Sequence, residues 1–367
     1  MHEFGGDMAW RDIRETRSAS GNSSNQADES SLAEPHELRD AERTFLKLLE
    51  LTRRGVLPAK LLPAVSNLQT ALSEDPCSQC HLLALSHDEL DVIFDGLSDP
   101  LQPELAVVFS STCKGLRTPL RAALEELEGQ HSDVKELCYH VPPYNHAESE
   151  TRLPMCCGLL RCQTSLKWDN LNVDSPVEAM STLGMIMGTN GLQYLQCLDI
   201  GCNGFGDAGA QQLFEGLGPG SLPKLQLLDI SGNNIGPAGA EAFAAALRRG
   251  AMPKLALLGL NGNPIGNQGV AGLAAPLRKL RKFMTLGIHA CEIGDEGMTS
   301  LLGNLGKDDF KTLKDIGLGE NNLTVTGCAT LLAAIKAGAL PCLEQVLFEE
   351  GNPFSADVVA ALAARKQ

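Results

Sequence analysis

Aromatic side chains are scarce in this chain of 367 residues, since Phe, Trp and Tyr make up only 4 % of it. The apolar 43 % must therefore come mainly from aliphatic residues, which excludes a core filled by aromatic rings. Positive charge is also short, because 30 Lys and Arg against 45 Asp and Glu leave a formal net charge of -15. Nucleic acids and acidic membranes bind clustered cations, so we expect neither as a partner.

Long hydrophobic runs are absent as well. No window has the roughly 18 to 20 apolar residues that a membrane helix requires, and the N-terminus, Met1–Ala19, is charged throughout, unlike an export signal. The chain has 12 cysteines, but a chain of this size without an export signal does not depend on disulfides. We therefore expect free thiols and a protein of the cytoplasm or nucleus.

Glycine and leucine are abundant, and in the C-terminal half they recur with a period of 28 to 30 residues. Each copy has leucines at the spacing of a short strand, then a turn, and then an apolar pair at helical spacing. Ordering about thirty residues costs more free energy than the apolar burial of one copy returns. The copies must therefore stack as a solenoid. A glycine stands at one fixed offset in five copies: Gly209, Gly239, Gly269, Gly297 and Gly327.

The turn after the strand carries an asparagine in four copies, Asn203, Asn233, Asn263 and Asn321. A buried backbone group without a partner costs about 1 to 3 kcal/mol, and a stacked amide can both donate and accept there. We expect a ladder of these amides along the solenoid. Cys291 takes this position in the remaining copy and should make a weaker rung.

The pattern LxxLxLxxNxIGxxGxxxLxxxL, found from about residue 190 to 367, resembles the ribonuclease-inhibitor type of leucine-rich repeat. The resemblance implies an α/β fold, a short leucine-rich-repeat solenoid with parallel strands inside and helices outside, used for protein binding. We expect the repeats over 192–367, with a displaced asparagine, Asn352, in a terminal cap. A linker and an N-terminal cap repeat are expected over 141–191.

The N-terminal part has no such period, and we expect a small all-α helical module ahead of the solenoid. Residues 1–34 are poor in large apolar side chains and predict a disordered tail, and 35–80 predict a helical segment. Within 82–140, Leu85 to about Leu120 resembles an F-box, a module that docks onto a Skp-type adaptor of cullin-based ubiquitin ligases. The resemblance gives Leu90, Ile93, Phe94 and Leu105 the docking role. A plain helical cap on the solenoid is the alternative.

Motifs of chemistry are few. The run Cys77–His81 fits the CxxCH spacing of haem attachment, and a zinc site with Cys156, Cys157 or Cys162 is a further option, but a plain loop is the preferred interpretation. The GxGxxG match at 204–209 is the turn of a repeat rather than a dinucleotide site. We predict no catalytic group, cofactor or metal.

The inner face of the strands is the expected partner surface, with glycines that leave its middle small and bare. The predicted partner-binding residues are Asp199, Asp229, Ser231, Asn261, His289, Asp315 and Glu349. We therefore predict a non-enzymatic protein-interaction module, with the substrate receptor of a cullin-RING ubiquitin ligase as the favoured hypothesis. The alternative is a scaffold or a regulator of a GTPase, because the repeats also resemble those of the Ran GTPase-activating protein.

Overall fold

The computed structural model describes residues 94, 98, 103, 106–107, 120–140, 157–170, 173–189, 191–348 and 355–364. The chain forms two compact units, residues 1–133 and 134–367. The expected tail and helical segment at 1–80 lie outside the described residues, and so does the CxxCH motif. None of the described helices is long and apolar enough to cross a membrane.

Helix α7 (Arg121–His140) is the longest described helix. Its buried side chains include Leu124, Leu127, Val134 and Leu137, which recur at multiples of a helical turn and form one apolar stripe. In the first unit, Phe94 is helical and only 2 % exposed. Leu90, Ile93 and Leu105, the other residues expected to dock an adaptor, lie outside the described residues.

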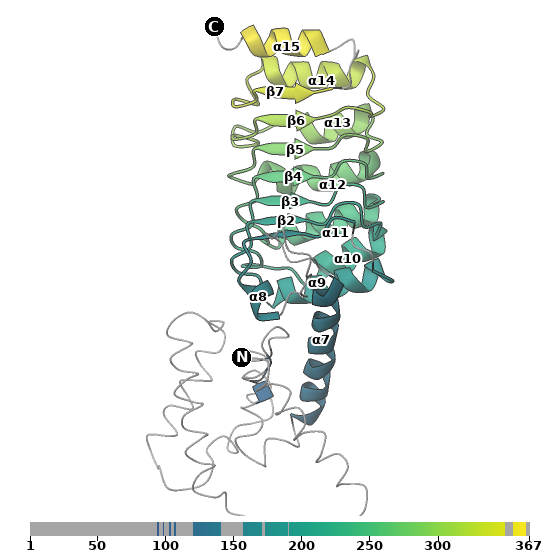
Figure 1. The fold of residues 1–367 in the computed structure, drawn as a ribbon. Coiled ribbons are helices and arrows are strands. Elements are labelled where there is room, and N and C mark those ends of the chain that lie inside the picture. The colour runs from purple at the N-terminus through teal and green to yellow at the C-terminus, as the bar shows by residue number, and fades with distance from the viewer. Residues whose placement is uncertain are drawn as a thin grey trace, which may run out of the picture. The chain divides into compact units, whose positions relative to one another are not determined.

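The repeats form one seven-stranded parallel sheet whose strand order is the sequence order (Figure 1). Its strands are β1 (Ser165–Lys167), β2 (Cys197–Asp199), β3 (Leu227–Asp229), β4 (Leu257–Gly259), β5 (Thr285–Gly287), β6 (Asp315–Gly317) and β7 (Gln345–Leu347). Every strand pairs with the next without a slip in register. Strands in sequence order whose first and last members do not pair with each other form an open stack of repeats, as in a solenoid.

A helix follows each strand and lies behind the sheet (Figure 1). These helices are α9 (Pro176–Gly188), α10 (Gly206–Glu215), α11 (Pro237–Arg248), α12 (Gly266–Arg278), α13 (Asp295–Leu302), α14 (Val325–Lys336) and α15 (Ser355–Ala364), and the short helix α8 (Cys157–Arg161) precedes β1. From α9 onward each helix packs against the next one along the chain. The predicted solenoid, with strands on one side and helices on the other, is confirmed.

The core lies between the sheet and the helices. The central residue of each of the first six strands is at most 1 % exposed: Leu166, Leu198, Leu228, Leu258, Leu286 and Ile316. In β7 the equivalent Val346 is only half-buried. Because side chains alternate along a strand, the first and third residues of each strand point away from the helices and form the inner face.

The glycine at the fixed offset lets each helix approach its own turn and the preceding helix. A Cβ at Gly239 would lie 2.7 Å from Ile235 Cγ2 and 2.9 Å from Ala210 Cβ, closer than real Cβ atoms come. Any side chain there would push α11 away from α10. This is why the repeat keeps glycine at this position.

The predicted asparagine ladder is confirmed. Nδ2 of Asn233 donates to the carbonyls of Ile200 at 2.9 Å and Ile230 at 3.0 Å, and its Oδ1 accepts the backbone N–H of Asn203 at 2.8 Å. Asn263 repeats these contacts one strand further on. Each amide thus satisfies buried backbone groups of two repeats.

The rung at Cys291 is weaker, as expected. Its Sγ donates to the carbonyls of Leu260 at 3.2 Å and His289 at 3.3 Å. Where the rung is an asparagine, as at Asn263, its Oδ1 accepts the N–H of Ile235 in the preceding repeat. The equivalent donor for Cys291 is the N–H of Ile265, which instead bonds to the carbonyl of Asn263 in its own turn at 2.7 Å. The thiol therefore leaves one backbone donor to find a local partner.

Side chains of one repeat also cap helices of its neighbours. Oδ1 of Asp207 accepts the N–H groups of Gly236 and Gly239, both at 2.7 Å, at the start of α11. Asn267 does the same for α13 and Asp295 for α14. These caps satisfy backbone donors that a helix start leaves free, and they link repeats on the helix side.

Candidate functional site

The inner face is built from two rows of side chains that the strand register places next to one another. The first row is Ser165, Cys197, Leu227, Leu257, Thr285, Asp315 and Gln345, and the second is Lys167, Asp199, Asp229, Gly259, Gly287, Gly317 and Leu347. Neighbouring strands of a sheet lie about 4.8 Å apart. Each row is therefore a closely spaced line of side chains running across the strands.

Asp199 and Asp229 are register partners on β2 and β3. Oδ1 of Asp199 accepts the N–H of Gly201 at 3.2 Å, and Oδ1 of Asp229 accepts that of Ser231 at 3.0 Å. Burial raises the pKa of the Asp199 carboxyl above its usual value, and the negative charge of Asp229 raises it further, against the Gly201 hydrogen bond. Each carboxylate stabilises the turn that follows its own strand by accepting a backbone N–H there. Together the two carboxylates make this end of the face acidic.

The expected bare middle of the inner face is wrong in one respect. A Cβ on Gly259 would lie 2.6 Å from Oδ1 of Asp229, and one on Gly287 would lie 2.9 Å from Oδ1 of Asn261. These glycines therefore make room for a polar side chain of the preceding repeat. At β4 and β5 the second row is therefore covered by polar side chains rather than bare.

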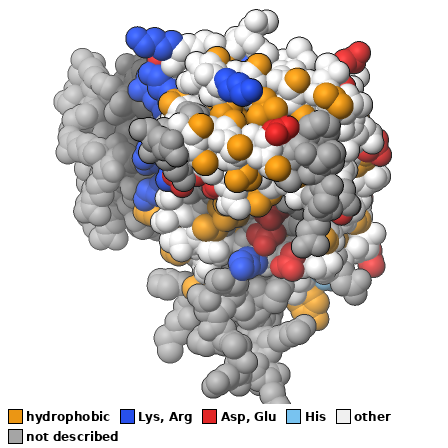
Figure 2. Space-filling view, turned by 90° about the horizontal axis from the view of Figure 1, so that it is seen from above, with side chains coloured by type: hydrophobic (Ala, Val, Ile, Leu, Met, Phe, Trp, Pro, Cys, Tyr) orange, Lys and Arg blue, Asp and Glu red, His pale blue; other side chains and the backbone are white. Residues whose placement is uncertain are grey.

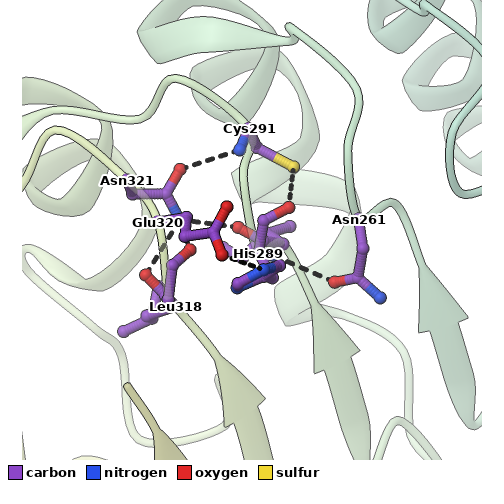
Figure 3. A network of polar contacts seen from close by, with 8 residues as sticks. Asn261, His289, Cys291, Leu318, Glu320 and Asn321 are labelled. Carbon is purple, nitrogen blue, oxygen red and sulfur yellow. Dashed lines mark hydrogen bonds and ion pairs between the residues drawn. The ribbon is translucent and has the colours of Figure 1, made fainter. Parts of the chain in front are cut away.

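Asn261, His289 and Glu320 form a polar group at the ends of β4, β5 and β6 (Figure 3). Oδ1 of Asn261 accepts the backbone N–H of His289 at 2.9 Å, and Nε2 of His289 lies 3.4 Å from Oε1 of Glu320. The imidazole and the carboxylate are both substantially exposed. Both side chains are available to a partner, and the Asn261 side chain holds the backbone of His289 in place.

Cys291 lies close to His289 in Figure 3 but does not form a nucleophile–base pair with it. The thiol is fully buried and donates to carbonyl oxygens rather than to the imidazole. Burial raises its pKa to about 11, against hydrogen bonds from Asn263 and Gly262 that lower it. A thiol so protonated is inert as a nucleophile. In the part of the chain that the structure describes, no three His, Cys, Asp or Glu side chains are placed to hold a metal ion.

The remaining predicted contact residues differ in accessibility. Oδ2 of Asp315 accepts the hydroxyl of Thr285 at 3.2 Å on the next strand. Oγ of Ser231 is out of solvent and has no hydrogen-bond partner among the described residues. Glu349 lies outside the described residues.

Sequence reasoning missed an apolar strip on the inner face. Leu227 and Leu257 are register partners in the first row and are half-buried. Met284, which directly precedes β5, is 40 % exposed. The adjacent leucines Leu227-Leu228 and Leu257-Leu258 could have predicted this strip. Side chains alternate along a strand, so only one leucine of each pair can face the core. We call Leu227, Leu257 and Met284 the apolar strip.

Comparison with known proteins agrees with this geometry. A family model described as "Leucine Rich repeat" matches residues 191–214 and 221–244. Ribonuclease inhibitor of Sus scrofa is 30 % identical over 173 residues, which cover 44 % of this chain and 33 % of the inhibitor. The chain thus spans about a third of the length of that relative.

Among solved structures, the actin-binding site 2 of leiomodin-1 is 14 % identical, with a TM-score of 0.33 over 39 % of this chain and 82 % of that one. The sequence matches and the parallel sheet in sequence order lead to one identification. The repeating units of this chain are leucine-rich repeats.

Proposed function

We propose that this protein is a non-enzymatic scaffold that binds a protein partner on the inner face of its repeats. The apolar strip carries the proposal, because Leu227 and Leu257 are held side by side on a hydrogen-bonded sheet and remain partly open to solvent. Covering the rest of each leucine would contribute up to about 1 kcal/mol. The similarity to ribonuclease inhibitor, a protein named for the protein that it inhibits, supports this use of the fold.

The polar groups around the strip would provide specificity. Asp199 and Asp229 lie on β2 and β3, and His289 and Glu320 follow β5 and β6, on the other side of the central strand β4. Charged groups at the rim of an apolar contact set orientation more than affinity. The proposed partner surface is therefore the apolar strip together with these four side chains.

The test compares capture from cell extract by wild type and by the double variant Leu227→Asp, Leu257→Asp, followed by titration of the purified captured protein. We expect the double variant to lose the partner. The matched control is Ala275→Asp, which places a carboxylate at an exposed position of α12 on the helix side and should retain it. Circular dichroism checks that all three chains are folded. Equal binding by the double variant would overturn the proposal.

We further propose that the scaffold is a substrate receptor of a cullin-RING ubiquitin ligase acting in the cytoplasm or nucleus. The F-box resemblance of the N-terminal module supports this role. Phe94, the one proposed docking residue that the structure describes, is helical and buried. Phe94 therefore packs inside its unit, and a substitution there would disturb packing as well as docking.

Titration of a purified Skp-type adaptor into the full chain by calorimetry tests the ligase role. We expect saturable binding, and we expect the variant Leu227→Asp, Leu257→Asp to bind the adaptor equally well, since the inner face is reserved for the target. Absence of binding by wild type would remove the ligase role and leave the scaffold role standing. No observation on the described residues favours the alternative of GTPase regulation.

A further inference from the structure

A row of lysines borders the apolar strip. The position directly before the first leucine of each repeat holds Tyr194, Lys224, Lys254 and Lys282 in four successive repeats. Nζ of Lys224 lies 4.4 Å from the ring centroid of Tyr194, so equivalent side chains of adjacent repeats contact each other. We call Lys224, Lys254 and Lys282 the lysine row.

All three members of the lysine row are exposed, as is Arg281 beside Lys282. None of the three has a carboxylate partner among the described residues. Lys314, by contrast, is paired with Glu344 at 2.8 Å. In a chain of net charge -15, a line of cations without partners is a surface that attracts anions.

The parallel arrangement of the repeats separates the two signs of charge. Acidic side chains such as Asp207 and Asp295 stand at helix N-termini, and basic ones such as Arg248 and Lys336 at helix C-termini, as the helix dipole favours. Seen from above in Figure 2, Lys and Arg gather toward the left side and most Asp and Glu lie elsewhere. Where its helices end and its strands begin, the solenoid therefore gathers cations beside β3, β4 and β5, while carboxylates such as Asp309 and Glu344 lie on the same edge beside β6 and β7.

Each lysine stands three residues before the first residue of its strand, so the lysine row lies at the edge of the sheet where the strands begin, on the side of the first row that holds Leu227 and Leu257. Leu227 follows Lys224 by three residues, and Leu257 follows Lys254 by three. On the other side of the strip lie Asp199 and Asp229. A ligand lying on the strip therefore meets cations along one flank and carboxylates along the other.

From this order, and resting on the proposed function, we infer that the inner face binds an amphipathic helix of a partner protein whose apolar stripe is bordered by Glu or Asp. Residues three and four apart on a helix lie about 5 to 6 Å apart, close to the spacing of about 4.8 Å between strands. A helix crossing the strands can thus pair successive carboxylates with Lys224, Lys254 and Lys282 while its leucines cover the apolar strip.

The two flanks also fix the orientation of that helix. Carboxylates turned toward Asp199 and Asp229 would be repelled, so the acidic stripe must face the lysine row. The same two aspartates disfavour a nucleic acid, whose phosphates would lie against them on a face this narrow. The inferred ligand is therefore an acidic and apolar protein segment.

The test uses two synthetic helical peptides of about 20 residues, long enough at 1.5 Å per residue to cross about six strands. One carries Leu along one stripe and Glu along the neighbouring stripe, and the other has Lys in place of Glu. Fluorescence anisotropy should show that full-length wild type binds the Glu peptide at least about tenfold more tightly than the Lys peptide. Raising the salt from about 50 mM to about 300 mM should weaken this preference.

The variant Lys254→Glu, Lys282→Glu should lose or reverse the preference. The matched control is Arg121→Glu, Lys135→Glu, which changes the net charge equally at exposed positions of α7, outside the sheet and its edges, and should keep it. Equal binding of both peptides by wild type, binding of neither, or tighter binding of a single-stranded oligonucleotide would overturn the inference. If capture of the partner still depends on Leu227 and Leu257 in that case, the scaffold function stands without the acidic helix.

Discussion

At the scale of single residues, buried amides determine how each turn is made. Asn233 is fully buried, and its side chain serves carbonyls of its own and the preceding repeat and two backbone N–H groups in the turn of that preceding repeat. Each turn thereby depends on a side chain that the next repeat supplies. The asparagine is a contact between repeats as well as a turn residue.

Replacing Asn233 by alanine should lower the free energy of unfolding by about 2 to 4 kcal/mol, because several buried backbone groups lose their partner. Urea denaturation followed by circular dichroism measures the loss. Asn261→Ala is the matched control, since Asn261 is half-buried and accepts one backbone N–H that water can reach, and it should cost less than about 1 kcal/mol. Equal losses in both variants would contradict the ladder.

Cys291 makes the stability depend on pH in the alkaline range. Its pKa is raised to about 11 from 9.0 by burial, so the unfolded chain releases this proton at a lower pH than the folded chain. The resulting stabilisation is complete below about pH 9 and should decline by on the order of 2 kcal/mol as the pH rises to about 11.

Urea denaturation of wild type and Cys291→Ala between these two pH values measures this effect. The stability advantage of wild type should shrink by that amount as the pH rises. Cys202→Ala, at an exposed cysteine, is the control and should follow wild type over this range. A constant difference between wild type and Cys291→Ala would show that the thiol is not held protonated by the fold.

At the scale of elements, helices are terminated by side chains from neighbouring repeats. Arg249 donates through Nε to the carbonyl of Leu217 and through Nη2 to that of Phe214, both at 2.6 Å, after the end of α10. Arg278, at the end of α12, donates to the carbonyls of Ser300, Leu301 and Gly303 at the end of α13. The planar guanidinium can serve several of the carbonyls that a helix end leaves free.

Arg278→Ala should therefore destabilise the repeats by about 1 to 3 kcal/mol, because charge-assisted hydrogen bonds are lost and carbonyls are left unpaired. The side chain is only 17 % exposed, so water replaces it poorly. Arg278→Lys keeps the charge but loses the fork and should fall between the two. Arg281→Ala, at an exposed neighbouring position, should cost less than about 0.5 kcal/mol, and thermal unfolding of the four chains ranks them.

At the scale of the whole molecule, each repeat is stabilised by its neighbours on both sides. In the described part of the repeats, strands pair and helices pack with those next along the chain, so an inner repeat has two interfaces and the last strand of the sheet has one. Val346 of β7 is accordingly only half-buried, whereas Leu258 at the equivalent position of β4 is fully buried. Stability should accordingly depend on position along the solenoid.

Leu258→Ala should lower the free energy of unfolding by about 2 to 4 kcal/mol through the cavity that it leaves. Val346→Ala, at the equivalent position of the last strand, should cost less than about 1 kcal/mol because little apolar area is lost. Chemical denaturation of both variants tests the comparison. A loss at Val346 as large as that at Leu258 would mean that the last strand is as integral to the core as β4.

The sequence by itself determined the repeat, its strand and helix, the stacking of the copies, the asparagine ladder and its weak rung at Cys291. Each of these follows from residue types at a fixed spacing within one unit. The tertiary structure decided the apolar strip, the side chains that cover Gly259 and Gly287, the pairing of His289 with Glu320 and the arginine caps. These depend on which residues of different repeats lie opposite one another, and a period that varies between 28 and 30 residues leaves that alignment open until the strands pair.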